Sequence, residues 1–438
     1  MYELARELKS RSLEGDVFTR KIRAKEVRYQ ADRFAGFEIR ENEGYGLRVI
    51  NPEGKIAFYA SSSFEESPQA VLERTLAASQ YGDRVKFHIP SYPSLVDWEN
   101  LVDPRVQNIK ETEMIELGEY LISRIKEEYP QLLVDLTVAA GLEEKSLFNH
   151  HQEKLSYAQT FFQVGVSVNQ TKEGDIVEIF SERNWGNREL DLDQFLQDIL
   201  LKIELSQRIS EISSGQYPVV FTPEGSITLL LPLFYGLNGK NIVFGRSPLG
   251  EKMNKVIFSP LFSLLERPKE KWALGSCPFD DEGVVTEQEK PLIEAGGLKN
   301  CWWDLWSASQ KQVPPSGNGF RSSYRDLPQP NFTNLEVKNG LRDRETLIEE
   351  IEEGLIVDSV LGLGQSNIAA GYFSCNIHLG FVVRKGEIQG RVKNVMISGN
   401  IYQDLKNVKE ISRDNRWVGG RMLLPYLLVD PIQVEAKN

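Results

Sequence analysis

The sequence contains few of the residues that hold metal ions or form disulfide bonds. There are three cysteines, Cys277, Cys301 and Cys375, and four histidines in 438 residues. The cysteines are odd in number, widely separated and without a CxxC pair, which is typical of a reduced, cytoplasmic protein. No two histidines have the helical spacing that places both rings on one face, and the neighbours His150 and His151 are expected to point apart at a strand end. We therefore expect no cofactor and no metal site in this chain.

Blocks of basic residues and long apolar runs are also missing. The chain has a formal net charge of -12 and no segment rich in Lys and Arg, which disfavours a role in nucleic-acid binding. The longest apolar run, residues 227–235, is too short to span a membrane and includes Pro232. Residues 1–20 are charged throughout, so we expect no signal peptide. These absences predict a cytoplasmic protein whose partners are neither nucleic acids nor membranes.

The pattern of turns and periodic segments predicts an α+β fold in three parts. Residues 1–90 are expected to form an N-terminal α+β domain, with strands over 27–41 and 46–59 and a helix that begins at Ser67 and ends at Gly82. Residues 105–212 are expected to form a central α+β domain, in which helices over 111–128 and 192–208 flank closely spaced, antiparallel strands. Residues 213–438 are expected to form a larger, strand-rich C-terminal domain.

Two segments of the C-terminal part differ sharply in pattern. Residues 374–382 alternate between apolar and polar side chains, which predicts a half-buried strand. Residues 314–331 (PPSGNGFRSSYRDLPQPN) have no periodicity, which is typical of a functional loop or a disordered one. The aromatic and arginine side chains of its 320–325 segment suit contact with a peptide or a partner protein.

Three further patterns have an ordinary interpretation beside a functional one. Residues 280–283 (DDEG) offer carboxylates for Ca²⁺ or Mg²⁺, but a turn whose carboxylates bond to the local backbone is the favoured interpretation. Gly362, Gly364 and Gly371 do not match the spacing GxGxxG, and a strand rather than a helix follows them, so no dinucleotide is predicted. Cys277 could act as a nucleophile, but a buried, inert thiol is the usual case.

An incomplete motif lies at residues 222–228 (TPEGSIT). Thr222 can cap a helix, Pro223 suits the first helical position and Glu224 complements the positive end of the helix. A zinc-protease helix needs a histidine before the glutamate and a second histidine one turn later, but Pro223 and Thr228 occupy these places. Glu224 is the one retained position of the motif, so no catalytic residue is predicted in this chain.

Short phrases follow one another in a specific order along the C-terminal part. They are 275–284 (GSCPFDDEGV), 318–321 (NGFR), 333–335 (TNL) before Gly340, 371–374 (GYFS), 386–388 (GEI) and 397–400 (ISGN). Together they resemble the TldD/PmbA family, whose members have been called modulators of DNA gyrase and have been linked to metalloprotease complexes. Residues 44–49 (GYGLRV) with Gly54 are similar to the first domain of the family, so the resemblance covers essentially the whole chain.

The resemblance also implies a place within the family. One branch carries HExxxH on a helix of the C-terminal domain and a later cysteine as the third zinc ligand. The corresponding residues here are 223–228 (PEGSIT), and no cysteine follows Cys375. This pattern is similar to the PmbA branch, also called TldE, which is the zinc-free partner of the catalytic subunit. The resemblance therefore implies a complex with a zinc-bearing TldD-like paralogue, or a homodimer, in a cytoplasmic metalloprotease that degrades unfolded or small peptides.

Contacts to such a peptide are expected at two groups of residues in the phrases that carry the resemblance, namely Gly319, Arg321, Asn334, Gly371, Phe373 and Ser374. An unfolded peptide can pair with a sheet edge through its backbone, which gives affinity with little sequence preference. Two alternatives stay open. The chain could be a self-associating scaffold or regulatory binding protein without a proteolytic role, or an independent hydrolase that uses Cys277 or another residue.

Overall fold

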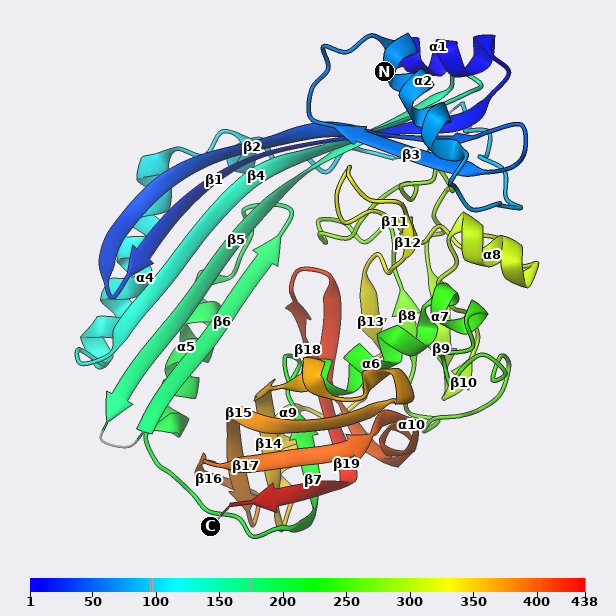
Figure 1. Ribbon diagram of the computed structural model, residues 1–438. Helices are drawn as coiled ribbons and strands as arrows, with labels where there is room; N and C mark the ends of the chain where they lie inside the picture. The colour runs from blue at the N-terminus through cyan, green and yellow to red at the C-terminus, as the bar shows by residue number, and fades with distance from the viewer. Residues whose placement is uncertain (95, 97, 173–174, 438) are drawn as a thin grey trace.

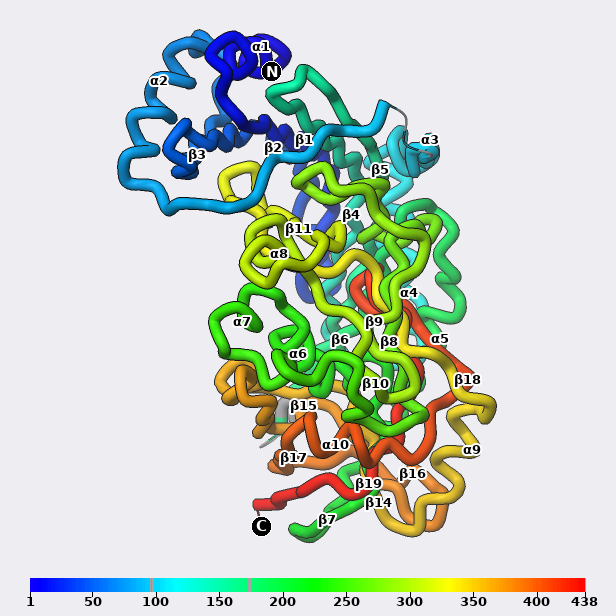
Figure 2. The backbone as a smooth tube through the Cα atoms, turned by 90° about the vertical axis from the view of Figure 1, so that its right-hand side faces the viewer, coloured from blue at the N-terminus to red at the C-terminus, as the bar shows by residue number. Residues whose placement is uncertain are grey.

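The structure of the chain is a computed structural model that describes residues 1–94, 96, 98–172 and 175–437. A long, curved sheet from the first half of the chain arches over a strand-rich C-terminal domain (Figure 1). The two termini lie at opposite ends of the molecule in both views (Figures 1 and 2). Among the described residues, no helix is long and apolar enough to cross a membrane.

One sheet takes strands from both predicted N-terminal domains. The elements of this part are α1 (Tyr2–Ser10), β1 (Glu14–Gln30), β2 (Arg33–Ile50), β3 (Ile56–Ser61), α2 (Pro68–Ser79), α3 (Pro104–Gln107), α4 (Glu111–Glu128), β4 (Leu133–Asn149), β5 (Lys154–Lys172), β6 (Asp175–Trp185) and α5 (Leu192–Ser206). Over the described residues the strands form a six-stranded antiparallel sheet in the order β3-β2-β1-β4-β5-β6. Because β1 pairs with β4 along almost its whole length, the segments 1–90 and 105–212 share a single sheet.

The long β1–β2 hairpin contains a turn that the sequence did not predict. Ala31 and Asp32 connect the strands with φ values of 47° and 69°, whereas we expected one strand through 27–41. That expectation was wrong because Ala-Asp lacks the glycine of the common two-residue hairpin turns. The Asp32 carboxylate holds this turn by accepting a hydrogen bond from the Val134 N–H at 2.8 Å and pairing with Lys126 at 2.8 Å.

The three predicted helices of this part form within a few residues of their expected bounds. The Ser67 hydroxyl caps α2 and accepts a hydrogen bond from the Ala70 N–H. An apolar cluster contains residues of α4, α5 and the adjacent face of the sheet, and it continues through Ile356 and Phe381 of the C-terminal domain. Figure 2 shows α3, α4 and α5 along one side of the molecule, opposite α6, α7 and α8. The helix α5 therefore joins the sheet to the C-terminal domain.

The C-terminal domain begins at β7. Its elements are β7 (Gly215–Phe221), α6 (Ile227–Leu237), α7 (Gly239–Val243), β8 (Leu264–Glu266), β9 (Lys290–Glu294), β10 (Gly297–Leu298), α8 (Leu305–Lys311), β11 (Gly319–Phe320), β12 (Gln329–Pro330), β13 (Leu335–Val337), α9 (Arg344–Glu349), β14 (Glu353–Leu361), η1 (Leu363–Gln365), η2 (Ile368–Ala370), β15 (Tyr372–Arg384), β16 (Glu387–Arg391), β17 (Val395–Asn400), α10 (Ile401–Asp404), η3 (Leu405–Asn407), β18 (Val408–Val418) and β19 (Met422–Ala436). The predicted α+β class is confirmed.

Most strands of this domain belong to one sheet, which has 11 strands over the described residues. Strand β7 pairs with both β14 and β19, so part of the sheet closes on itself around an apolar core. Strand β15 confirms the predicted alternation over its first half, because Cys375 and Ile377 are buried while Ser374 and Asn376 are exposed. From Leu379 to Val383 both faces of the strand are buried, so the alternation expected to continue to residue 382 ends there. The closed part of the sheet provides a rigid base for the turn that follows β7.

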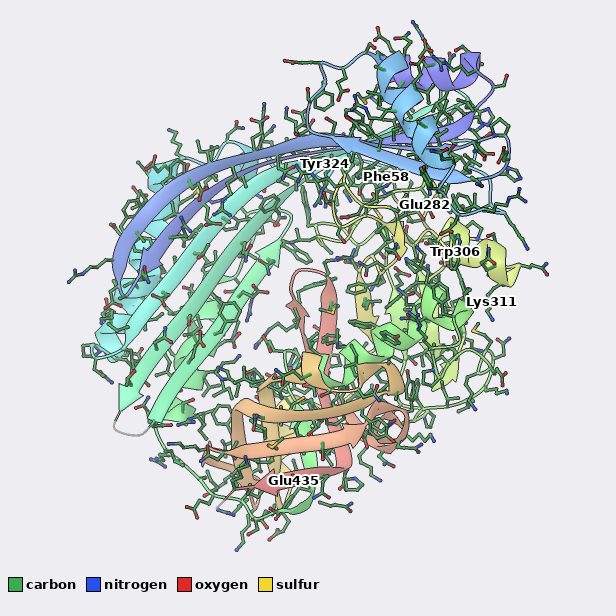
Figure 3. The ribbon with its side chains drawn as sticks, in the orientation of Figure 1. Phe58, Glu282, Trp306, Lys311, Tyr324 and Glu435 are labelled. Carbon is green, nitrogen blue, oxygen red and sulfur yellow. The ribbon has the colours of Figure 1, made fainter. Side chains whose placement is uncertain are left out.

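The loop 314–331 packs against the six-stranded sheet. It contains the short β11–β12 hairpin and buries Tyr324, which lies at the contact between the sheet and the C-terminal domain with Phe58 and Glu282 (Figure 3). A Cβ atom at Gly44 of β2 would lie 2.4 Å from the Tyr324 ring, so a glycine is needed for this close approach. The Arg20 guanidinium donates a hydrogen bond to the Ser322 carbonyl at 2.6 Å. Tyr324 and the Ser322 carbonyl of this loop therefore contact the chain's own sheet.

Candidate functional site

Glu224 lies in a turn between β7 and α6. The Thr222 N–H donates a hydrogen bond to the Val357 carbonyl at 3.0 Å, and the Thr222 hydroxyl accepts one from the Gly225 N–H at 3.1 Å. A Cβ atom at Gly225 would lie 2.0 Å from the Val357 carbonyl oxygen, so the turn requires glycine here. The helix α6 begins at Ile227, which makes the predicted helical start at position 223 wrong. The retained glutamate therefore precedes the helix.

Two arginines from opposite parts of the fold face the Glu224 carboxylate. Arg416 of β18 donates a hydrogen bond from Nη1 to Oε1 at 3.2 Å, and Nη1 of Arg183 in β6 lies 4.0 Å from the same oxygen. Both arginines also pair with Asp198 of α5, at 3.0 Å for Arg416 and 2.6 Å for Arg183. Glu224 is thus tied to the six-stranded sheet and to α5 as well as to its own domain.

A second buried ion pair lies beside this group. Nζ of Lys202 in α5 is 2.9 Å from Oδ2 of Asp358 in β14, and the Thr222 hydroxyl donates a hydrogen bond to Oδ1 of Asp358 at 3.2 Å. Although burial opposes the charge of Lys202, the carboxylates of Asp358 and Glu224 raise its pKa. We call Arg183, Asp198, Lys202, Glu224, Asp358 and Arg416 the Glu224 network, in which three cations face three carboxylates.

The network determines what the Glu224 carboxylate can do. Burial raises the pKa of a carboxyl group, but the positive charges of Lys202, Arg416 and Arg183 lower the pKa of Glu224 to about 2. A general base works best when its pKa lies near the operating pH. At neutral pH Glu224 is therefore an ionised partner of the arginines and a weak proton acceptor.

Two cavities flank the network. One, of about 590 Å³, lies between β6 and β18 and is lined by Arg183, Arg416, Gln194, Trp185 and Trp417, among others. The ring centroids of the two tryptophans are 5.0 Å apart. The other, of about 200 Å³, adjoins Lys202 and Asp358. The larger cavity combines charged groups with aromatic surface, and its volume is within the range of small-ligand sites, about 300–1,000 Å³.

Sequence reasoning missed five members of this network: Arg183, Asp198, Lys202, Asp358 and Arg416. They come from β6, α5, β14 and β18, which are far apart in the chain. No local motif contains them, and no spacing rule connects an arginine of the first half with one near the end. The fold alone brings them around Glu224.

Gly319 and Arg321, two of the residues expected to contact substrate, are buried and hold the 314–331 loop in place. The Gly319 N–H donates a hydrogen bond to Oδ2 of Asp280 at 2.8 Å, and the Arg321 N–H donates one to Oδ2 of Asp281 at 2.8 Å. The Arg321 guanidinium lies over the ring of Phe18, 5.1 Å from its centroid. These contacts explain both residues as parts of the packing between loop and sheet.

The other four expected residues differ in exposure. The Asn334 side chain is buried, and it bonds to the Gly275 N–H and the Ser276 hydroxyl, both at 2.8 Å. Phe373 belongs to the apolar core, Gly371 is buried with a φ of 84°, and Ser374 is exposed. Figures 1 and 2 both place β11 apart from β15, so the six residues do not form one surface. Their contact with substrate stays a prediction.

The carboxylates of residues 280–283 are engaged within the chain, as the turn interpretation predicts. Oδ1 of Asp280 accepts hydrogen bonds from the Glu282 N–H at 3.0 Å and the Val284 N–H at 2.9 Å. Glu282 pairs with Arg48 of β2 at 2.5 Å, and Nε of Arg48 donates to Oδ1 of Asp16 in β1 at 3.1 Å. This turn therefore anchors the C-terminal domain to the sheet.

His150, His151 and Cys277 are not members of the Glu224 network. The rings of His150 and His151 have centroids 3.9 Å apart, so the expectation that they point apart was wrong, because both lie in the β4–β5 turn rather than on a strand. Within residues 1–94, 96, 98–172 and 175–437, no group of three or more His, Cys, Asp and Glu side chains is arranged to hold a metal ion. Burial raises the pKa of the Cys277 thiol, which makes it a poor nucleophile at neutral pH.

The C-terminal domain matches a known family. Residues 214–436, just over half of the chain, match the model of the PmbA/TldA metallopeptidase C-terminal domain. The chain belongs to the PmbA/TldD family. This confirms the membership predicted from its short phrases, and it makes the chain a member of a family of peptidases.

Curated relatives in the PmbA/TldD family include metalloproteases by name. The metalloprotease TldD homolog of Buchnera aphidicola subsp. Acyrthosiphon pisum is 26% identical over 236 residues, which are 54% of this chain and 48% of the relative. The metalloprotease PmbA homolog of Haemophilus influenzae is 30% identical over 205 residues, 47% of this chain and 43% of the relative. The chain thus spans about half the length of these relatives.

Solved structures of PmbA/TldD-like proteins share the fold over nearly the whole chain. TldE from Thermococcus kodakarensis has a TM-score of 0.87 at 20% identity and covers 97% of each chain. A protein from Thermotoga maritima, described as a candidate modulator of a DNA gyrase, has a TM-score of 0.86 at 22% identity and covers 98% of each chain. These likenesses establish the arrangement of the curved sheet and the C-terminal domain.

Pro223 and Thr228, which stand where a zinc-protease helix carries its two histidines, do not fit a zinc ion in this chain. Pro223 offers no side-chain donor, and the hydroxyl residue Thr228 is 1% exposed within α6. Glu224, which would act on a metal-bound water, is instead paired with arginines. Zinc chemistry therefore has no support at this position of the chain.

Proposed function

We propose that this chain is a non-catalytic, TldE/PmbA-like subunit of a cytoplasmic metalloprotease complex that degrades unfolded or small peptides. Zinc would be held by a TldD-like partner subunit. The observation that carries the proposal is the state of Glu224: ion pairs with Arg416 and Arg183 occupy the one retained residue of the protease motif. The names of the relatives support membership in a peptidase family, and the buried free cysteines suit a reducing compartment.

In this proposal the chain contributes substrate binding rather than bond cleavage. The described part of β6 pairs with β5 on one side and is the edge of the sheet, and its last three residues, Arg183–Trp185, line the 590 Å³ cavity. An edge strand can hold an extended peptide through backbone hydrogen bonds, which suits unfolded substrates of varied sequence. Trp185 and Trp417 would add apolar contact at the same place.

The proposal is tested by mixing this chain with the zinc-bearing paralogue from the same genome. We expect size-exclusion chromatography to show a stable mixed complex that cleaves an unfolded protein and loses activity with a chelator. Elemental mass spectrometry of the separated chains should find zinc in the paralogue. A mixed complex that does not form would favour the scaffold interpretation, and activity of this chain alone that survives chelation and is lost on alkylation would favour a cysteine hydrolase.

A matched pair of variants identifies the subunit that carries the catalytic glutamate. We expect Glu224→Gln in this chain to leave kcat/KM of the mixed complex within about twofold, because a glutamate with a pKa of about 2 contributes little as a base. The same glutamate-to-glutamine change in the HExxxH motif of the paralogue should lower kcat by at least about 100-fold. The proposal fails if Glu224→Gln produces the large loss.

A further inference from the structure

A polar cavity of about 360 Å³ lies where the six-stranded sheet meets the C-terminal domain. It shares no lining residue with the two cavities beside the Glu224 network. Arg20, Lys145 and Tyr157 line it from the sheet, and Arg321 and Arg421 line it from the C-terminal domain. Arg321 comes from the same loop as Tyr324, which Figure 3 places at this contact. The volume suits a small ligand.

Positive side chains predominate in this cavity. Among the described residues, its lining has four cationic side chains and one carboxylate, that of Glu143. Nε of Arg20 pairs with Oε1 of Glu143 at 2.6 Å, and Nζ of Lys145 lies 3.3 Å from Oδ1 of Asp281 behind the wall. The carboxylates near these two cations are therefore already engaged.

The two cations from the C-terminal domain are less well compensated. Arg321 has Nη2 at 3.6 Å from Oδ1 of Asp16, beyond hydrogen-bond distance, and neither its Nε nor its Nη2 has a hydrogen-bond acceptor among the described residues. Within the same part of the chain Arg421 pairs with no carboxylate and donates to the carbonyls of Thr333 and Phe332. Burial lowers the pKa of Arg421, as expected for a cation that lacks a counterion.

A buried hydroxyl adds a neutral donor to the same lining. Tyr157 is 5% exposed, and its ring packs against Phe279 and Trp98. Tyr157 lines the cavity from the six-stranded sheet. Burial raises the pKa of Tyr157 well above its ordinary value, so the hydroxyl keeps its proton and can donate it to an acceptor.

We propose that this cavity binds a small oxyanion, a carboxylate or a phosphate, with the unpartnered N–H groups of Arg321, together with Arg421 and Tyr157, as its donors. A guanidinium presents parallel N–H groups that match two oxygens of such an anion. The anion would supply the negative charge that the cavity lacks and would bridge the sheet and the C-terminal domain. The carboxylate of a short peptide and free inorganic phosphate share this chemistry. The proposal does not depend on the protease role, because it concerns residues of this chain alone.

Calorimetric titration of the full chain at low ionic strength tests the proposal and distinguishes the two sources. The probes are inorganic phosphate, N-acetyl-Ala-Ala with a free carboxylate, and the same dipeptide as its amide. We expect saturable binding of phosphate, of the free-acid peptide or of both, and none of the amide. Binding of the free-acid peptide alone identifies peptide carboxylates as the source, and binding of phosphate alone identifies phosphate. Absence of saturable binding of either anion at millimolar concentration would overturn the proposal.

Substitutions then locate the bound anion. Tyr157→Phe keeps the ring contacts and removes only the hydroxyl, so we expect folded protein with about tenfold weaker binding. Arg421→Gln should abolish binding, with circular dichroism to confirm the fold. Arg246→Gln is the matched control, because Arg246 lies over the Phe244 ring outside the cavity. If Arg421→Gln does not fold, the affinity of Tyr157→Phe for the anion tests whether the anion binds in this cavity. An affinity equal to that of wild type would overturn the assignment of the anion to this cavity.

Discussion

Two buried clusters of charge join the six-stranded sheet to the C-terminal domain, and the pKa values of Glu224 in one and Asp280 in the other are shifted in opposite directions. In the Glu224 network, cations from β6, α5 and β18 surround Glu224 and lower its pKa to about 2. The second cluster, which we call the Asp280 cluster, comprises Asp16, Arg48, Asp280, Asp281, Glu282 and Arg321. There burial and the neighbouring Glu282 raise the pKa of Asp280, although backbone N–H groups act in the opposite direction.

The difference shows what each cluster does. Carboxylates that are crowded together and buried serve as backbone acceptors and anchors, and their charge is held mainly by Arg48. The Glu224 carboxylate is instead matched by more than one cation, which makes it a weak base at the place where a zinc-protease motif needs one. The ion pairs of Glu224, and not its position in the motif, therefore determine what its carboxylate does.

The largest expected effect comes from removing the central cation of the Asp280 cluster. Arg48→Met leaves Asp16 and Glu282 buried without their partner, so we expect the free energy of unfolding to fall by about 3–5 kcal/mol. Urea denaturation followed by circular dichroism measures this loss. Arg40→Met on the same strand is the control, because Arg40 pairs with Glu38 at the surface and should stay close to wild type. Equal stability of the two variants would mean that the cluster is not an anchor.

The pH dependence of stability should separate the two clusters. Because the pKa of Glu224 is lowered from 4.5 to about 2 on folding, its contribution is complete above pH 4.5 and is lost as the pH falls towards 2. A shift of this size corresponds to about 3 kcal/mol. The stability difference between wild type and Glu224→Gln, measured by urea denaturation, should therefore shrink as the pH falls from 5 to 2.

For Asp280→Asn we expect the stability difference from wild type to change with pH in the opposite direction. A carboxyl group whose pKa is raised on folding reduces stability as the pH rises above its ordinary value of 3.8. The difference between wild type and Asp280→Asn should therefore become less favourable to wild type as the pH increases. If the two variants showed the same slope with pH, the contrast between the clusters would be wrong.

The sequence predicted local elements well where a pattern repeats along the chain. The structure shows the cap at Ser67, the helix over 111–128 and, over residues 374–378, the expected alternation. The Ala31-Asp32 turn was missed because its residues are not those of a common hairpin turn. The single sheet of β1–β6 was missed because β1 and β4 pair although their residues are more than 100 positions apart in the chain. A local pattern of apolar and polar residues does not show which distant strand a strand pairs with.

The candidate site, too, could be predicted from the sequence only in part. The motif gap at 223 and 228 is visible in the sequence, and so is Glu224 between these positions. The arginines that control its pKa are not, because Arg183 and Arg416 lie on strands from different halves of the chain. The phrases that carry the resemblance do not distinguish packing from binding, since a glycine or asparagine within them can be required for either. Asn334 takes part in packing, and its contact with substrate stays a prediction.

The smallest expected effects distinguish packing from substrate contact among the residues carried over from the resemblance. Asn334→Ala leaves the Gly275 N–H without its acceptor in a buried place, so we expect a loss of about 1–3 kcal/mol in the free energy of unfolding. Ser374→Ala removes an exposed hydroxyl, so stability should change little. Peptide affinity of the mixed complex, measured by fluorescence anisotropy, then tests the role in binding. A stable Ser374→Ala variant with weaker peptide binding would support substrate contact on β15. An unchanged affinity would show that the Ser374 hydroxyl does not contact the peptide.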